Sequence, residues 1–234
     1  MYKNIILIIV SCILLQGCID IPLPQSQANQ YKRVAVISDI SDEFPANRSG
    51  FHPEYRRYNI DLGINHTFVA AAVSALSAKY EVTDLSQYGK QFADQPKYWP
   101  ETQTVIGTET RLSAGEVIRR LVSPATYDAY IVISPGPAID ANGAKIYGVG
   151  IHKIPGLFTD GGCLIYAGAI VSVIDGKNYD AIARVYSPSD ARAVGIDCRA
   201  WAAPDQSIST IKPMLDALIT RSVPQILKNA QLIQ

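Results

Sequence analysis

The sequence has no excess of charge of either sign and few histidines. Its 234 residues include 21 Lys and Arg against 21 Asp and Glu, so the formal net charge is zero, and they include only three His. A nucleic-acid-binding surface needs clustered positive charge to neutralise phosphates. The balance therefore argues against nucleic acid as a partner and against electrostatic binding to an anionic membrane surface.

The apolar segment near the start of the sequence is too short to cross a membrane. It comprises the eleven residues from Ile5 to Leu15 and follows the positive charge of Lys3. A transmembrane helix needs about 20 apolar residues, whereas the core of a secretory signal needs roughly 7 to 15. We therefore interpret residues 1–17 as a signal peptide.

The end of this segment resembles the lipobox of bacterial lipoproteins, which has Leu at −3, a small residue at −1 and an invariant Cys. These positions are Leu15, Gly17 and Cys18. The resemblance implies that Cys18 is acylated and anchors the mature protein in a lipid bilayer; the alternative is an ordinary signal peptide with a chance cysteine. Ile19 replaces the Asp that typically retains lipoproteins at the inner membrane. In a Gram-negative cell we therefore expect the periplasmic face of the outer membrane.

Two cysteines remain after the signal and the anchor are set aside. Cys163 and Cys198 are separated by 35 positions. In an oxidising compartment such a pair usually forms a disulfide, although two buried thiols are the alternative. Neither has a second Cys or His at the spacing of a metal site, so we expect no metal there.

Residues 18–30 contain two prolines and several polar residues without an apolar period, which predicts a tether between the lipid and the folded domain. Residues 31–234 contain no second linker or internal repeat. We therefore predict one α/β domain behind the tether.

The hydrophobic pattern of this domain predicts an α/β fold of the α+β kind. It indicates a mixed sheet of about six strands with a βαβ start, an antiparallel meander and a C-terminal helix. Three segments have no clear pattern and are predicted to be irregular, namely 41–59, 87–104 and 187–207. The predicted strands are 33–40, 80–85, 128–134, 146–152, 163–174 and 180–186, and the predicted helices are 62–76, 113–123 and about 209–232, the last kinked or divided at Pro224.

No motif in the chain identifies a reaction. The segment 34–42, VAVISDISD, resembles the first motif of calcineurin-like metallophosphoesterases, but the His expected two positions after Asp39 is Ser41. No Gly-x-Ser-x-Gly elbow is present, and each His has a structural explanation. We therefore assign no catalytic residue, cofactor or metal, and leave enzymatic activity open.

One geometric argument does predict a site. The loops after parallel strands at 33–40, 80–85 and 128–134 should emerge at one sheet edge, where ligands of open α/β sheets bind. Aromatic and Arg side chains there would suit a protein partner; the alternative is that they only cover the sheet end. The candidate partner-binding residues are Asp39, Asp42, Arg48, Tyr55, Arg57, Tyr88, Tyr98, Trp99 and Asp140.

The order of elements resembles the anticodon-binding-like domains of envelope lipoproteins, such as the curli-secretion lipoproteins and the amino-terminal domain of the TolB type. This resemblance implies assembly or scaffolding. We therefore expect a non-enzymatic module that binds another envelope protein. The alternative is a periplasmic hydrolase or small-ligand-binding protein that uses loops 39–58, 86–104 and 135–145.

Overall fold

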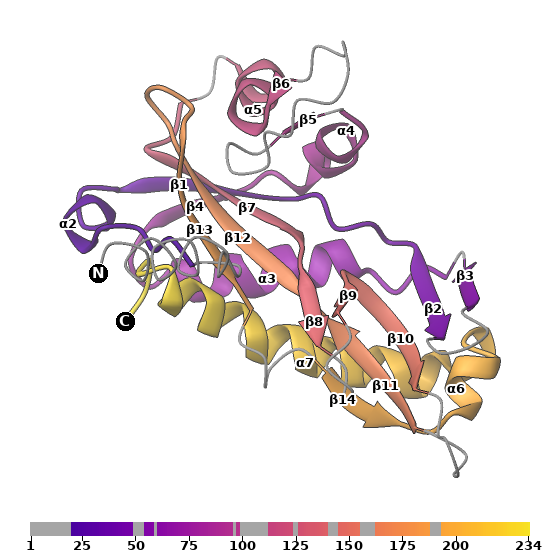
Figure 1. Ribbon diagram of the computed structural model, residues 1–234. Helices are drawn as coiled ribbons and strands as arrows, with labels where there is room; N and C mark the ends of the chain where they lie inside the picture. The colour runs from indigo at the N-terminus through magenta and orange to yellow at the C-terminus, as the bar shows by residue number, and fades with distance from the viewer. Residues whose placement is uncertain are drawn as a thin grey trace, which may run out of the picture.

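A computed structural model of the chain describes most of the domain (Figure 1). The described residues are 20–48, 54–58, 60–95, 97–98, 112–123, 126–139, 145–154, 162–187 and 193–234. Cys18 lies outside them, so the structure does not bear on its acylation. None of the helices within these ranges is both long enough and apolar enough to span a membrane.

Two five-stranded sheets form the centre of the molecule. Sheet A has the order β13-β12-β7-β1-β4, with β7, β1 and β4 parallel and the other two pairings antiparallel. Its strands are β1 (Arg33–Ser38), β4 (Glu81–Asp84), β7 (Ala129–Pro135), β12 (Ala169–Asp175) and β13 (Ala181–Tyr186).

Sheet B has the order β14-β11-β10-β2-β3, in which only the β10–β2 pair is parallel. Its strands are β2 (Phe44–Arg48), β3 (Glu54–Tyr58), β10 (Val149–Ile154), β11 (Gly162–Ala167) and β14 (Ala193–Ile196). Two short pairs complete the strands, β5 (Lys97–Tyr98) with β6 (Leu112–Ser113) and β8 (Pro137–Ile139) with β9 (Lys145–Tyr147).

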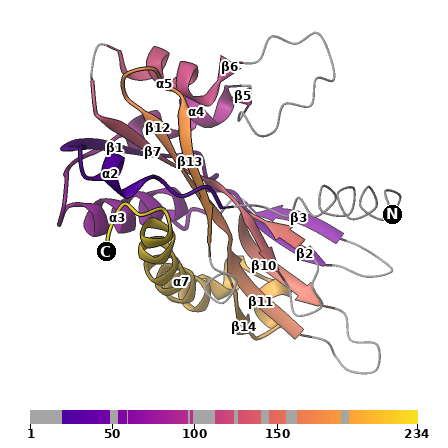
Figure 2. The ribbon, with the colours of Figure 1, turned by 60° about the vertical axis from the view of Figure 1, so that its left-hand side comes forward.

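Helices cover both faces of sheet A but only one face of sheet B (Figures 1 and 2). The long helix α7 lies under both sheets, beside α3, whereas α4 and α5 cover the other face of sheet A. The helices are α2 (Gln25–Ala28), α3 (Ile64–Leu76), α4 (Gly89–Asp94), α5 (Ala114–Val122), α6 (Arg199–Ala202) and α7 (Ile208–Asn229), with 3₁₀ turns η1 (Ser86–Tyr88) and η4 (Asp205–Ser207).

The βαβ start predicted from the sequence is confirmed as β1, α3 and β4, with β1 and β4 parallel. Alternate residues of β1 enter different cores: Val34 and Val36 pack with α3 and α7, whereas Ala35 and Ile37 pack with α4 and α5. Burial on both faces explains why this strand has a continuous apolar sequence.

The α+β class and the C-terminal helix are also confirmed, but the single sheet of about six strands is corrected to two sheets of five. The predicted meander is divided between them: Gly148 separates β9 from β10, and Gly168 separates β11 in sheet B from β12 in sheet A. Backbone hydrogen bonds join Gly136, Gly148 and Gly168 in a ring at 2.7–2.9 Å. We call these three residues the glycine junction. A Cβ on Gly168 would lie 2.4 Å from the carbonyl oxygen of Gly136, so the strands can cross this closely only without a side chain.

Pro224 does not divide the C-terminal helix, because α7 is continuous through both Pro213 and Pro224. A proline inside a helix costs about 3 kcal/mol. Here the apolar face of α7, including Leu215, Ile219 and Ile226, is fully or almost fully buried against both sheets. This packing offsets the cost of the missing hydrogen bonds.

The tether predicted for residues 18–30 is corrected for its described part, residues 20–30. Ile21 forms a β-bridge with Arg184 of β13, and the side chains of Leu23 and Ala28 are completely buried in the main core. Most residues of this segment are exposed, both prolines included, but the β-bridge and the two buried side chains attach it to the domain. These residues therefore belong to the folded domain.

Candidate functional site

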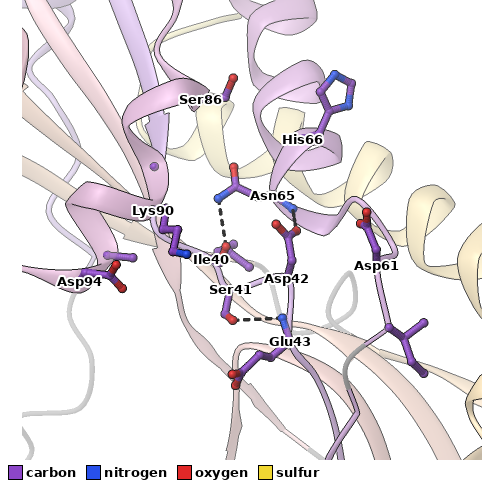
Figure 3. Close-up of a pocket in the computed structure, with 13 residues that line it drawn as sticks. Ile40, Ser41, Asp42, Glu43, Asp61, Asn65, His66, Ser86, Lys90 and Asp94 are labelled. Atoms are coloured by element: carbon purple, nitrogen blue, oxygen red, sulfur yellow. Dashed lines mark hydrogen bonds between the residues drawn. The ribbon is translucent and has the colours of Figure 1, made fainter.

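A cavity lies where β1 and β4 end, at the edge of sheet A that the sequence predicts (Figure 3). It has a volume of about 750 Å³ and lies between the loop after β1, the start of α3, and the η1–α4 segment after β4. We call this cavity the notch. Its ionisable lining residues are Asp42, Glu43, Asp61, His66, Lys90 and Asp94.

Hydrogen bonds between the β1 loop and α3 fix the floor of the notch. The carboxylate of Asp42 accepts a hydrogen bond from the backbone N–H of Asn65 at 3.0 Å, close to the start of α3. The side-chain amide of Asn65 donates in turn to the carbonyl oxygens of Ser38 and Ile40 at 3.2 and 3.0 Å. A Cβ on Gly89 would come within 2.7 Å of the Ser38 oxygen, so the first residue of α4 must be small. These contacts give the notch a preformed shape.

The lining of the notch is acidic. Four carboxylates face one ammonium group, that of Lys90. Asp61 also accepts a hydrogen bond from the backbone of Gly63, at 3.0 Å, which shapes the turn into α3. The imidazole of His66 is exposed and points away from Asp42 and Asn65 (Figure 3). The notch is therefore suited to a cationic group.

An exposed pair on the edge strand β3 adjoins the notch. Tyr55 is 60% exposed, its hydroxyl accepts a hydrogen bond from Arg57 Nε at 3.1 Å, and the guanidinium lies 5.4 Å from the ring centroid. Arg57 Nη1 lies 2.9 Å from a carboxylate oxygen of Glu43, which lines the notch. We call Tyr55 and Arg57 the β3 pair. Through Glu43 it connects the notch to sheet B.

Among the predicted site residues, Asp42 lines the notch and Arg57 reaches its rim through Glu43. Asp39 lies beside it, with its backbone N–H donating to the Ile133 oxygen at 3.0 Å. The structure thus places three candidates near the end of sheet A, together with Tyr55 beside Arg57.

The other candidates are dispersed or not described. Arg48 lies at the far end of β2, 3.9 Å from Glu54, and Tyr88 packs against the core between sheet A and helices α4 and α5. Tyr98 belongs to the short strand β5, of which only the backbone is described. Trp99 and Asp140 lie outside the described residues.

Five ionisable residues of the notch were not among the predicted site residues, namely Glu43, Asp61, His66, Lys90 and Asp94. Asp61 could have been found from its position two residues before Gly63 and the helix, a spacing typical of a local turn. Lys90 and Asp94 lie on α4, within a segment predicted to be irregular. Glu43 lies within residues 41–59, which the sequence also predicts to be irregular. Their convergence depends on the tertiary fold, which no local pattern reveals.

The Cys163–Cys198 disulfide predicted from the sequence is present, with an S–S distance of 2.16 Å. It joins β11 to the start of α6, where Trp201 is almost completely buried. The indole N–H of Trp201 donates to the Asn47 oxygen at 2.9 Å. Its ring centroid lies 5.3 Å from the guanidinium carbon of Arg56 and 5.1 Å from the ammonium nitrogen of Lys153. These contacts fix α6 to sheet B and support a structural role. In the described part of the chain, no three His, Cys, Asp or Glu side chains are arranged to hold a metal ion.

Comparisons with known proteins show no sequence relationship, because no family model and no curated protein matches the chain. The chain is distantly similar to a PelC dodecamer structure from Paraburkholderia phytofirmans, with 12% identity over 91% of this chain and 95% of that one, at a TM-score of 0.38.

Two further solved structures are also similar. Protein XCC0632 from Xanthomonas campestris, of the DUF330 family, is 10% identical over 92% of this chain and 94% of its own, at a TM-score of 0.40. Lipoprotein GNA1162 from Neisseria meningitidis is 8% identical over 76% of this chain and 95% of its own, at a TM-score of 0.28. Scores at this level assign the chain to no family.

Proposed function

We propose that this chain is a lipid-anchored protein of the cell envelope that binds another envelope protein without catalysing a reaction. The anchor is Cys18, for which the support is the resemblance of Leu15, Gly17 and Cys18 to a lipobox. The Cys163–Cys198 disulfide fits an oxidising compartment. In a Gram-negative cell, Ile19 after the anchor favours the periplasmic face of the outer membrane.

The resemblance of the predicted element order to anticodon-binding-like envelope domains agrees with an assembly role. This resemblance supports the proposal less strongly than the site does, because an order of elements does not show which side chains bind a partner.

The observation that carries the proposal is the continuity between the acidic notch and the β3 pair. Arg and Tyr are enriched among residues that dominate binding energy at protein interfaces, and both side chains of the pair are exposed. The notch adds four carboxylates against one Lys. Together they suit a partner segment that places a Lys or Arg in the notch and an aromatic or apolar side chain against Tyr55.

Reversing one charge of the notch tests this proposal. Asp94 is an exposed lining residue at the end of α4, so Asp94→Lys should leave the fold intact while repelling a basic partner segment. Glu81→Lys is the matched control, because Glu81 is also exposed but lies at the opposite end of sheet A, at the start of β4. Partner recovery after crosslinking in the intact envelope should fall by about tenfold or more in the first variant only.

Thermal unfolding of both variants provides the necessary check on folding, and their melting temperatures should match that of the native chain. Equal recovery of the same crosslinked partner by Asp94→Lys and by the native chain would contradict the proposal. An equal fall in partner recovery in both variants would also contradict the proposal, because the fall would then depend on the net charge of the protein and not on the notch.

A further inference from the structure

The start of the described chain forms part of the edge of sheet A. The carboxylate of Asp20 accepts a hydrogen bond from the Tyr186 N–H at 2.9 Å. Ile21 and Arg184 exchange two backbone hydrogen bonds, each of 2.8 Å, on the outer side of β13. Figure 2 shows this segment running from α2 along β13. The folded domain therefore begins no later than Asp20.

Contacts further along the segment prevent it from acting as a spacer. The backbone N–H of Leu23 donates to the Ala230 oxygen at 3.3 Å, and its side chain is fully buried. The hydroxyl of Tyr80 lies 3.2 Å from the Ala28 oxygen, behind the short helix α2. Releasing residues 20–30 would expose this buried surface.

The chain between the anchor and the domain is consequently very short. Asp20 follows Cys18 by two residues, and two extended residues span at most ~7 Å. We propose, on the basis that Cys18 is acylated as in the proposed function, that this short connection holds the β13 edge of sheet A directly against the bilayer. Ile21 is a large apolar residue that is 45% exposed beside the anchor, which suits contact with the lipid interface.

This placement orients the rest of the molecule. Sheet A has β13 at one edge and β4 at the other, with the notch at the ends of β1 and β4. Four strand spacings separate the two edges, a distance of about 19 Å. Tyr186, which holds Asp20, lies level with the carboxyl ends of β7 and β1, so the anchor and the notch are separated sideways across the sheet. The bilayer therefore lies along the β13 edge, and the notch beside β4 remains accessible to a partner on the aqueous side.

Fluorescence quenching in vesicles tests the placement. The full chain, acylated in cells and reconstituted into phosphatidylethanolamine and phosphatidylglycerol vesicles, carries one label at Gln25→Cys or at Asp94→Cys, both exposed positions. A quencher attached to the lipid headgroups should quench the label at position 25 several-fold more strongly than the label at position 94. A flexible Gly-Ser insertion of about eight residues between Ile19 and Asp20 adds ~15 Å of reach. It should reduce quenching at position 25, whereas the same insertion after Gln234 should not.

The outcomes separate this inference from the proposed function. Equal quenching at the two positions, or strong quenching at position 25 that persists after the N-terminal insertion, would overturn the inference while leaving the acylated anchor and the notch intact. Weak quenching of both labels would also overturn the inference, because it would show that the β13 edge faces away from the lipid, as it would where a protein covers that edge. Mass spectrometry of the N-terminal peptide reports acylation directly, and an unmodified Cys18 would overturn both.

Discussion

Sheets A and B differ in how they are covered. The central strands β1, β7 and β12 of sheet A are buried on both faces, because α3 and α7 pack on one side and α4 and α5 on the other. Sheet B has helices α6 and α7 on one face only. Its edge strand β3 is half-buried or exposed along its whole length, and β14 is half-buried or exposed at its three described side chains.

This difference shows where the chain can carry recognition. A strand that is buried on both faces can present only its end to a partner, as β1 does at the notch. An edge strand with one open face can present side chains along its length, as β3 does with Tyr55 and Arg57. The candidate site combines the two, because it contains both the notch and the β3 pair.

Removal of the disulfide should give the largest effect and should affect sheet B more than sheet A. Cys163 and Cys198 close a loop of 35 residues, and replacing both with Ala should lower the free energy of unfolding by about 3 to 4 kcal/mol. Because both cysteines belong to the sheet B region, amide hydrogen exchange should accelerate more in β11 and β14 than in β1 and β7.

The native chain treated with a mild reductant is the control, and it should reproduce the exchange pattern of the double variant. A uniform loss of protection across both sheets would instead show that they unfold as one unit, and the comparison between them would fail.

Substitution at the glycine junction should have the next largest effect. In Gly168→Ala the new Cβ would meet backbone atoms of Gly136 and Pro137 at 2.4 to 2.8 Å, which only a backbone shift can relieve. The expected loss in the free energy of unfolding is about 2 to 3 kcal/mol by urea denaturation.

Gly195→Ala is the matched control within sheet B, because a Cβ there meets nothing within 4 Å. It should change stability by less than about 0.5 kcal/mol. An equally small loss of stability in Gly168→Ala would mean that the glycine junction tolerates a side chain and that the two sheets are joined more loosely.

The contrast between fully buried strands and partly exposed strands also explains which strands could be predicted from the sequence. β1 and β7 were predicted within a few residues, because burial on both faces gives continuous apolar runs such as Val34–Ile37. The strands β2 and β3 were missed, since Pro45 and the two arginines of Glu54–Tyr58 resemble a loop in any short window. Their pairing with β10 supplies the burial that local sequence lacks.

The candidate site was predictable in position but not in composition. Parallel β1 and β4 fix the sheet edge at which their loops emerge, so Asp42 could be placed there from the sequence. Asp94 could not, because α4 is a short helix without an amphipathic period. The link from Glu43 to Arg57 depends on the pairing of β2 with β3, two strands that the sequence did not predict.

The smallest predicted effect concerns the amino end of sheet A. The carboxylate of Asp128 accepts backbone hydrogen bonds from Arg33 at 2.9 Å and Lys32 at 2.7 Å, and so joins the start of β1 to the residue before β7. These bonds, the one from Arg33 first, hold the pKa of Asp128 below its usual value. In Asp128→Asn the amide oxygen accepts the same bonds without charge, so the expected loss at pH 7 is about 1 kcal/mol.

The pH dependence of that loss identifies its cause. A carboxyl whose pKa is lower in the folded state stabilises the fold above its unfolded value, near 4, and this stabilisation is lost as the pH falls through the folded value. The difference in unfolding free energy between the native chain and Asp128→Asn should therefore shrink steadily below about pH 4. If this difference in unfolding free energy stays constant from neutral to acidic pH, the charge of Asp128 does not contribute to stability. The amino end of sheet A would then depend on packing and neutral hydrogen bonds, as its buried centre does.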